Sequence, residues 1–129
     1  MGISIKQSLQ RVLTTTTDVN TIIITDQDGV PIITEGLGEK IRYINTLTNA
    51  FATALEQGVK LGLGDLKSWT FVYETQQVVV LARAPFQIYI LATPEANTIA
   101  LTTLIEGHLK PILLELESVY RQVNGNKGF

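Results

Sequence analysis

The chain has 129 residues, of which 45% are hydrophobic and 17% are charged, enough apolar material for one domain with its own core. The charged fraction lies below the roughly 25% typical of soluble domains, which fits either a surface partly covered by a partner or an ordinary compact small domain. The net charge of −2 argues against nucleic-acid binding, because no basic excess is present to hold phosphates. The absence of cysteine excludes disulfides, Cys-ligated zinc and thiol nucleophiles.

The N-terminal region predicts neither a signal peptide nor a membrane anchor. Residues 6–11 carry basic and polar side chains, and no stretch reaches the ~20 apolar residues that a membrane helix needs. Met1-Gly2 resembles the start of a myristoylation motif, but Lys6 stands where that motif needs Ser or Thr. We therefore expect a cytosolic chain without an acyl group, forming a single domain over residues 1–129 with an ordered core of about residues 3–123.

A first amphipathic helix is predicted ahead of residues 14–17, a run of threonines that are poor helix formers. Ser4 and Gln7 have the spacing of a capping box at its start. The apolar residues that recur at helical spacing are Ile5, Leu9, Val12 and Leu13.

A β-hairpin follows, because the β-branched runs 22–24 and 30–34 flank a turn that ends in Asp28-Gly29. Pro31 has no N–H to donate, so the second strand is predicted to lie at a sheet edge or to turn the position of the missing N–H outward.

A second helix is predicted after a loop at Gly36 and Gly38, ending at Gly58 or Gly62. Alanines on both sides of Phe51 leave room for another helix to approach, although packing flat on the sheet is an alternative on the opposite face. The apolar positions of this helix are Ile41, Ile44, Leu47, Phe51, Ala54 and Leu55.

Three further strands are predicted over residues 68–74, 77–83 and 86–92. The apolar runs in the last two strands, and in residues 22–24, are continuous rather than alternating, which is typical of sheets covered on both faces. Helices on both sides of the sheet, in a three-layer arrangement, are therefore expected.

The last helix is predicted from about residue 97 to 123, capped by Asn97 or by Thr93 with Pro94, and ended by Asn124-Gly125. Pro111 should bend it where Gly107 leaves room, and two short helices remain an alternative. Its expected buried stripe is Leu101, Ile105, Leu109, Ile112, Leu116, Val119, Tyr120 and Val123.

Catalytic and metal-binding motifs are absent from the sequence. His108 has no second His or Cys to share a metal site. Asp26 and Asp28 resemble half of a calcium loop, but apolar residues 30–33 follow, which favours a turn. Two Gly-x-Gly fragments lack the rest of any nucleotide-binding motif. No cofactor or metal site is predicted, and an enzyme is improbable.

The strongest binding signal is the aromatic alternation of Trp69, Phe71 and Tyr73. An uncovered strand of this kind invites pairing with another chain, so we favour a partner-binding edge over the alternative, an internal strand with core aromatics. Phe51→Asp is accordingly expected to disrupt pairing and leave the fold intact.

The order of elements, and several stretches of sequence, resemble the roadblock/LC7 (longin-related) family. The resemblance covers nearly the whole chain and, more narrowly, points to the MAP kinase scaffold subunits of the late endosomal/lysosomal adaptor complex called Ragulator. The loop at 35–42 and the tail past Val123 do not match clearly. The matching stretches are residues 26–33, 57–63, 73–79, 96–98 and 109–116.

The resemblance implies an α+β three-layer sandwich, in which a five-stranded antiparallel sheet has helix two on one face and helices one and three on the other. It also implies a heterodimer with a second roadblock subunit through helix two and strand three, so that the two sheets run continuously. It implies no catalytic residue, and a lipid anchor on a different subunit. The expected interface residues are Leu47, Phe51, Ala54, Leu55, Trp69, Phe71 and Tyr73.

The first functional hypothesis is a non-enzymatic adaptor that helps to position Rag GTPases, which signal amino-acid supply to the target-of-rapamycin complex, and MAP kinase pathway kinases. Its expected location is the cytoplasmic face of late endosomes or lysosomes. A dynein light chain or a small-GTPase co-regulator is the second hypothesis, and an enzyme or small-molecule binder is the third.

Overall fold

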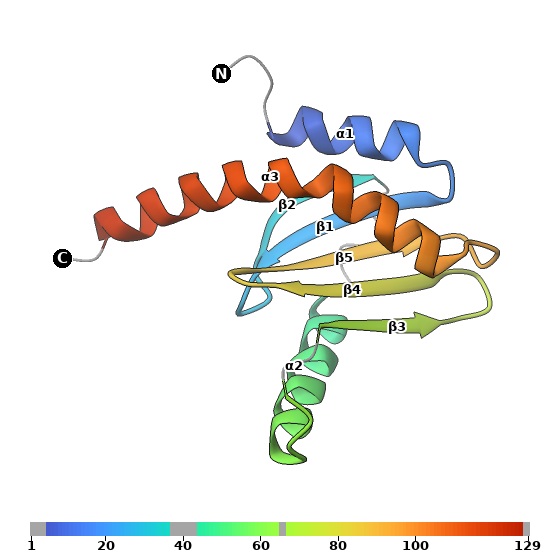
Figure 1. Ribbon diagram of the computed structural model, residues 1–129, viewed down its shortest axis with the longest axis horizontal. Helices are drawn as coiled ribbons and strands as arrows, with labels where there is room; N and C mark the ends of the chain where they lie inside the picture. Colours follow the sequence, from blue (N-terminus) through green and yellow to red (C-terminus); the bar gives the residue numbers. More distant parts are fainter. Residues whose placement is uncertain (1–4, 37–43, 65–66, 128–129) are drawn as a thin grey trace.

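The computed structural model describes residues 5–36, 44–64 and 67–127, and Figure 1 shows helices on both faces of its sheet. The predicted Ser4 cap and the Gly38 loop lie outside the described residues. The predicted succession of elements is confirmed. The elements are α1 (Ile5–Thr15), β1 (Val19–Asp26), β2 (Pro31–Gly36), α2 (Ile44–Lys60), β3 (Ser68–Val72), β4 (Gln77–Arg83), β5 (Phe86–Ala92) and α3 (Thr98–Lys127).

The five strands form one antiparallel sheet in the order β2-β1-β5-β4-β3. The hairpin partner β2 is therefore one edge, as Pro31 predicted, and β3 is the other. The strand β3 is shorter than predicted and ends at Val72, so Tyr73 follows the strand.

Two separate cores lie on the two faces of the sheet. Leu9 of α1 and Leu109 of α3 pack on one face with Ile22 and Ile24 of β1. Between these two isoleucines, Ile23 points to the opposite face and packs with Phe51 of α2. The continuous apolar runs thus serve two layers, as predicted. Figure 1 shows α1 and α3 on one side of the sheet and α2 on the other, with the end of α2 extending away from it.

The hairpin turn is built by the side chain of Asp26. Its Oδ1 accepts hydrogen bonds from the N–H groups of Asp28 (2.9 Å) and Val30 (3.0 Å), so the turn interpretation of this segment is confirmed. Gly29 has a φ of +83°, and a Cβ placed there would lie 2.8 Å from the Cβ of Thr48 on α2. The hairpin turn therefore touches the second helix directly.

The ends of α2 and α3 follow local backbone rules. At the end of α2, Leu63 N–H donates to the Gly58 carbonyl and Gly62 N–H to the Val59 carbonyl, each at 3.0 Å, with Gly62 at φ +73°. This pair of bonds is a Schellman motif, so Gly62 rather than Gly58 ends the helix.

Asn97 caps α3, because its Oδ1 accepts the Ala100 N–H at 3.2 Å. The alternative cap at Thr93 is not used. The helix is continuous through Pro111 and extends to Lys127, so the predicted end at Asn124-Gly125 was wrong.

Candidate functional site

The backbone of β3 is hydrogen-bonded on one side only. Two backbone hydrogen bonds, each 2.9 Å long, show which residues face β4. Ala82 N–H donates to the Lys67 carbonyl, and Tyr73 N–H donates to the Gln76 carbonyl. Because successive residues of an antiparallel strand face alternately toward and away from the neighbouring strand, the other residues of β3 direct their polar groups outward. The residues whose N–H and C=O groups point to the open side are Ser68, Thr70 and Val72. We call this row the β3 edge.

An aromatic row supports the β3 edge on the α2 face of the sheet. The ring centroid of Trp69 lies 6.1 Å from that of Phe51 and 4.4 Å from that of Phe71, and Tyr73 continues the row at 6.3 Å from Phe71. Exposure rises along the row, since Trp69 and Phe71 are half-buried and Tyr73 is 50% exposed. The row therefore runs along β3, from the core contact with Phe51 to an exposed ring just past the end of the strand.

The residues expected at a partner interface fall into three groups. Trp69, Phe71 and Tyr73 lie together beside the open edge, and Ala54 is half-buried on α2 nearby. Phe51 is 0% exposed, so it supports the aromatic row from within the chain and presents no surface of its own. The side chains of the two remaining residues, Leu47 and Leu55, lie outside what the structure describes.

Sequence reasoning missed the exposed apolar end of α2. Val59, Leu61 and Leu63 surround the Gly62 turn and are 61%, 73% and 74% exposed. The available signal was three bulky apolar residues at alternate positions around a glycine that ends a helix. Neighbouring exposed apolar side chains of this size mark an interaction surface.

A cavity of about 530 Å³ lies between the end of α2 and the start of β3. Trp69 and Leu63 provide its large apolar walls, and Lys67 is the one charged residue among the lining residues that the structure describes. The described lining residues are Ala54, Gly58, Leu63, Gly64, Lys67, Ser68 and Trp69. We call it the α2–β3 pocket.

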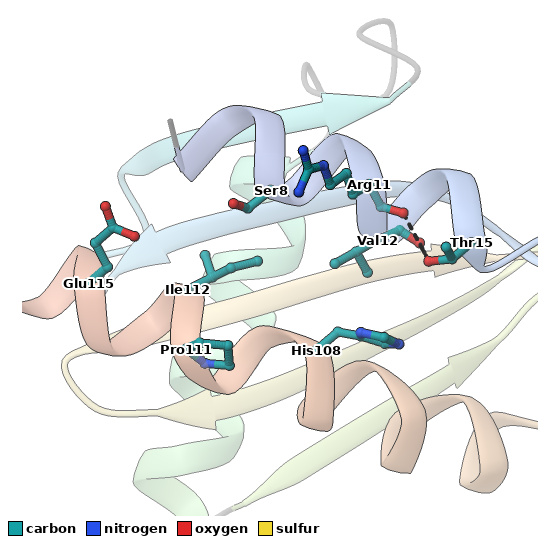
Figure 2. Close-up of a pocket in the computed structure, with 8 residues that line it drawn as sticks. All are labelled: Ser8, Arg11, Val12, Thr15, His108, Pro111, Ile112 and Glu115. Atoms are coloured by element: carbon teal, nitrogen blue, oxygen red, sulfur yellow. Dashed lines mark hydrogen bonds between the residues drawn. The ribbon is translucent and has the colours of Figure 1, made fainter. Parts of the chain in front are cut away.

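A second concavity, the α1–α3 groove, lies on the other face of the sheet and contains His108 (Figure 2). Ser8, His108 and Glu115 all line it, and a serine, a histidine and a carboxylate are the residue types of a catalytic relay. Among the described residues no hydrogen bond joins these three side chains, and Figure 2 shows His108 and Glu115 separated along the helix by Pro111 and Ile112. The groove thus lacks the linked nucleophile, base and orienting group that nucleophilic catalysis requires.

Among the residues that the structure describes, Tyr89 is the titratable group that its surroundings perturb most clearly. Burial raises the pKa of its hydroxyl, which donates to Oε1 of Gln87 at 3.0 Å inside the core. The neutral phenol is therefore a structural group on the α2 face. Within the described ranges there is no cluster of three or more potential metal ligands, and no helix there has both the length and the apolar character needed to cross a bilayer.

Comparison with known sequences identifies the family. Residues 3–120 match the family described as mitogen-activated protein kinase kinase 1 interacting. The chain belongs to this family. Its relatives include the Ragulator complex protein LAMTOR3 of Pagrus major, 35% identical over 127 residues, and that of Homo sapiens, 34% identical over 127 residues. Each comparison covers 92% of this chain and 97% of the relative.

Solved structures extend the comparison to the fold. A roadblock/LC7 domain from Streptomyces avermitilis superposes with a TM-score of 0.75 at 14% identity, covering 87% of this chain and 97% of that one. MglB of Myxococcus xanthus gives a TM-score of 0.69 at 11% identity, covering 92% and 95%. At such identities the likeness concerns the fold alone. The predicted roadblock/LC7 fold and the resemblance to Ragulator subunits are thereby confirmed.

Proposed function

We propose that this member of the family is a non-enzymatic adaptor subunit of a Ragulator-type complex. It pairs with a second roadblock subunit through the β3 edge and the aromatic row beside it. Within the larger complex it helps to position Rag GTPases and MAP kinase pathway kinases at the cytoplasmic face of late endosomes or lysosomes. A lipidated anchor on another subunit attaches the complex to the membrane.

The open β3 edge is the observation that carries this proposal. Three residues, Ser68, Thr70 and Val72, direct backbone donors and acceptors away from the sheet, and the five residues of β3 include neither a charge nor a proline. A strand without these protections is a template for another strand. Addition of a partner strand would satisfy the outward groups and extend the sheet.

The family relationship supports the choice of partner and complex. Relatives about one-third identical over nearly the whole chain are Ragulator complex proteins, and the roadblock fold is shared with bacterial proteins. A scaffold of this kind needs complementary surfaces rather than a catalytic centre.

The proposal is tested by blocking the outward backbone of β3. Thr70→Pro removes an N–H that points away from β4, so the existing ladder keeps its hydrogen bonds while an added strand loses a donor. Thr70→Val is the matched control, because it changes the side chain and keeps the N–H. The tagged full-length chain and both variants are expressed in cells, and co-purifying roadblock subunits are quantified by mass spectrometry.

Wild type and Thr70→Val should retain the same second roadblock subunit, together with Rag GTPases, and Thr70→Pro should lose them. Equal recovery with Thr70→Pro would show that pairing does not use the β3 edge. Recovery of a second copy of this chain in place of a different roadblock subunit would overturn the heterodimer and favour a self-pairing role, such as a dynein light chain or a small-GTPase co-regulator.

A further inference from the structure

The α2–β3 pocket adjoins the start of the β3 edge, where a strand added to β3 would run. Ser68 belongs both to the β3 edge and to the pocket lining, and Trp69 connects the pocket to the aromatic row. The end of α2 extends away from the sheet (Figure 1), and the described residues that line the pocket come from this end, from the residues just after it and from the start of β3. Any chain paired with the β3 edge would therefore pass its mouth.

The walls and charge of the pocket specify what it can hold. Leu63 and Trp69 give it apolar walls, and Ala54 and Gly58 leave its interior wide. Within the described part of the chain, no carboxylate lies within ion-pair distance of Lys67, whereas Lys60 on the neighbouring helix is paired with Glu56 at 3.2 Å. The pocket thus combines an apolar cavity with a cation that has no counter-charge among the residues described.

We propose that this pocket receives a large apolar side chain of the second roadblock subunit, next to a carboxylate of that subunit which pairs with Lys67. This inference rests on the proposed function, because it specifies how the same partner is recognised. The anchor residue, rather than the strand pairing, selects the partner: backbone hydrogen bonds between strands are largely independent of sequence, while a pocket discriminates between side chains.

Gly58 provides a clean way to fill the pocket. A Cβ placed at Gly58 meets no atom within 4 Å, and its φ lies outside the left-handed region, so a side chain there should enter the pocket without disturbing the chain. Gly58→Phe is therefore the test variant. Gly107→Phe is the matched control, because Gly107 is also helical and also faces open space, but lies on α3 across the sheet.

The test uses the purified pair of full-length subunits. The partner is the roadblock subunit that co-purifies with the wild-type chain, and its affinity for each variant is measured by calorimetric titration. Gly58→Phe should weaken binding by at least about tenfold, as expected when a central contact of an interface is blocked. Gly107→Phe should bind like wild type, and circular dichroism should show both variants folded.

Lys67→Glu provides a second, independent readout of the same pocket. Replacing the cation with a carboxylate should weaken binding by about fivefold at low salt and by less at high salt. The same reversal on α3, Lys110→Glu, should leave binding unchanged.

Two results would overturn the inference. Unchanged affinity of folded Gly58→Phe would show that the pocket is empty in the pair, while leaving the proposed function standing. Failure of the wild-type chain to recover any second roadblock subunit would overturn the proposed function and this occupant together.

Discussion

The two edges of the sheet are treated in opposite ways. The β2 edge begins with Pro31, has an irregular register with β1 between Ile24 and Thr25, and holds Glu35 against α1. Proline, irregular pairing and a charged side chain are all devices by which proteins protect an edge from other chains. The β3 edge has none of them and exposes 74% of Val72. The difference indicates one edge closed to other chains and one prepared for pairing.

The largest effect is expected at Phe51, the buried ring that packs beneath the aromatic row of the β3 edge. We expect Phe51→Asp to unfold the chain, because loss of a large core ring costs about 3–5 kcal/mol and an unpaired buried carboxylate adds to that cost. Phe51→Leu keeps an apolar group and should lose much less. Urea unfolding followed by circular dichroism measures both. A folded Phe51→Asp variant that fails to pair would restore the expectation from sequence.

Gln77 tests how the sheet beside β3 is held to the turn that precedes α3. Its Nε2 donates to the carbonyls of Thr93, Pro94 and Ala96 at 3.0–3.1 Å, and it pairs in register with Val72 at the end of β3. Gln77→Leu should cost about 1–3 kcal/mol, because buried carbonyls lose their donor. The neighbouring Gln76→Leu is the control, with a change below about 0.5 kcal/mol. Equal unfolding midpoints for the two variants would contradict this role.

A lysine substituted on each edge strand compares how readily the two edges pair with another chain. We expect the isolated wild-type chain to self-associate through the β3 edge, and Thr70→Lys to weaken this by about tenfold because lysine opposes edge pairing. Ile32→Lys on β2 should change little. Light scattering over a concentration series gives the dissociation constants. A wild-type chain that stays monomeric at high concentration would contradict the prediction.

The smallest effect is expected at the protected edge. Glu35 lies 3.4 Å from Nζ of Lys6 and accepts a hydrogen bond from Gln10 at 3.2 Å. Because the Lys6 side chain is 64% exposed, Glu35→Gln should cost about 0.2–1 kcal/mol, and the loss should shrink in high salt. Thermal unfolding at two salt concentrations measures it. A loss that does not depend on salt would point to packing of Glu35 instead.

Much of the fold was predictable because its signals are local. The missing N–H of Pro31 located one edge, and continuous apolar runs such as 22–24 indicated two covered faces. Asn124-Gly125 misled the prediction, since α3 continues to Lys127 and a stop signal competes with the helix already formed. Local propensity is weak evidence where neighbouring turns favour the same helix.

The candidate site was predictable only in part. The alternation of Trp69, Phe71 and Tyr73 located the open edge, but sequence alone could not distinguish an aromatic that faces a partner from one that supports the edge from behind. Phe51 is of the second kind. The α2–β3 pocket was not predictable, because it forms between a helix end and a strand start whose angle depends on tertiary packing.

Gly29 gives the hairpin a role that reaches beyond the β2 edge. Because the backbone of Gly29 lies against Thr48, the turn limits how closely α2 can approach the sheet. A methyl group at this position would push the helix outward and tilt its far end, which forms one wall of the pocket. A change in the loop of one hairpin would therefore alter the fit of a partner at the other end of α2.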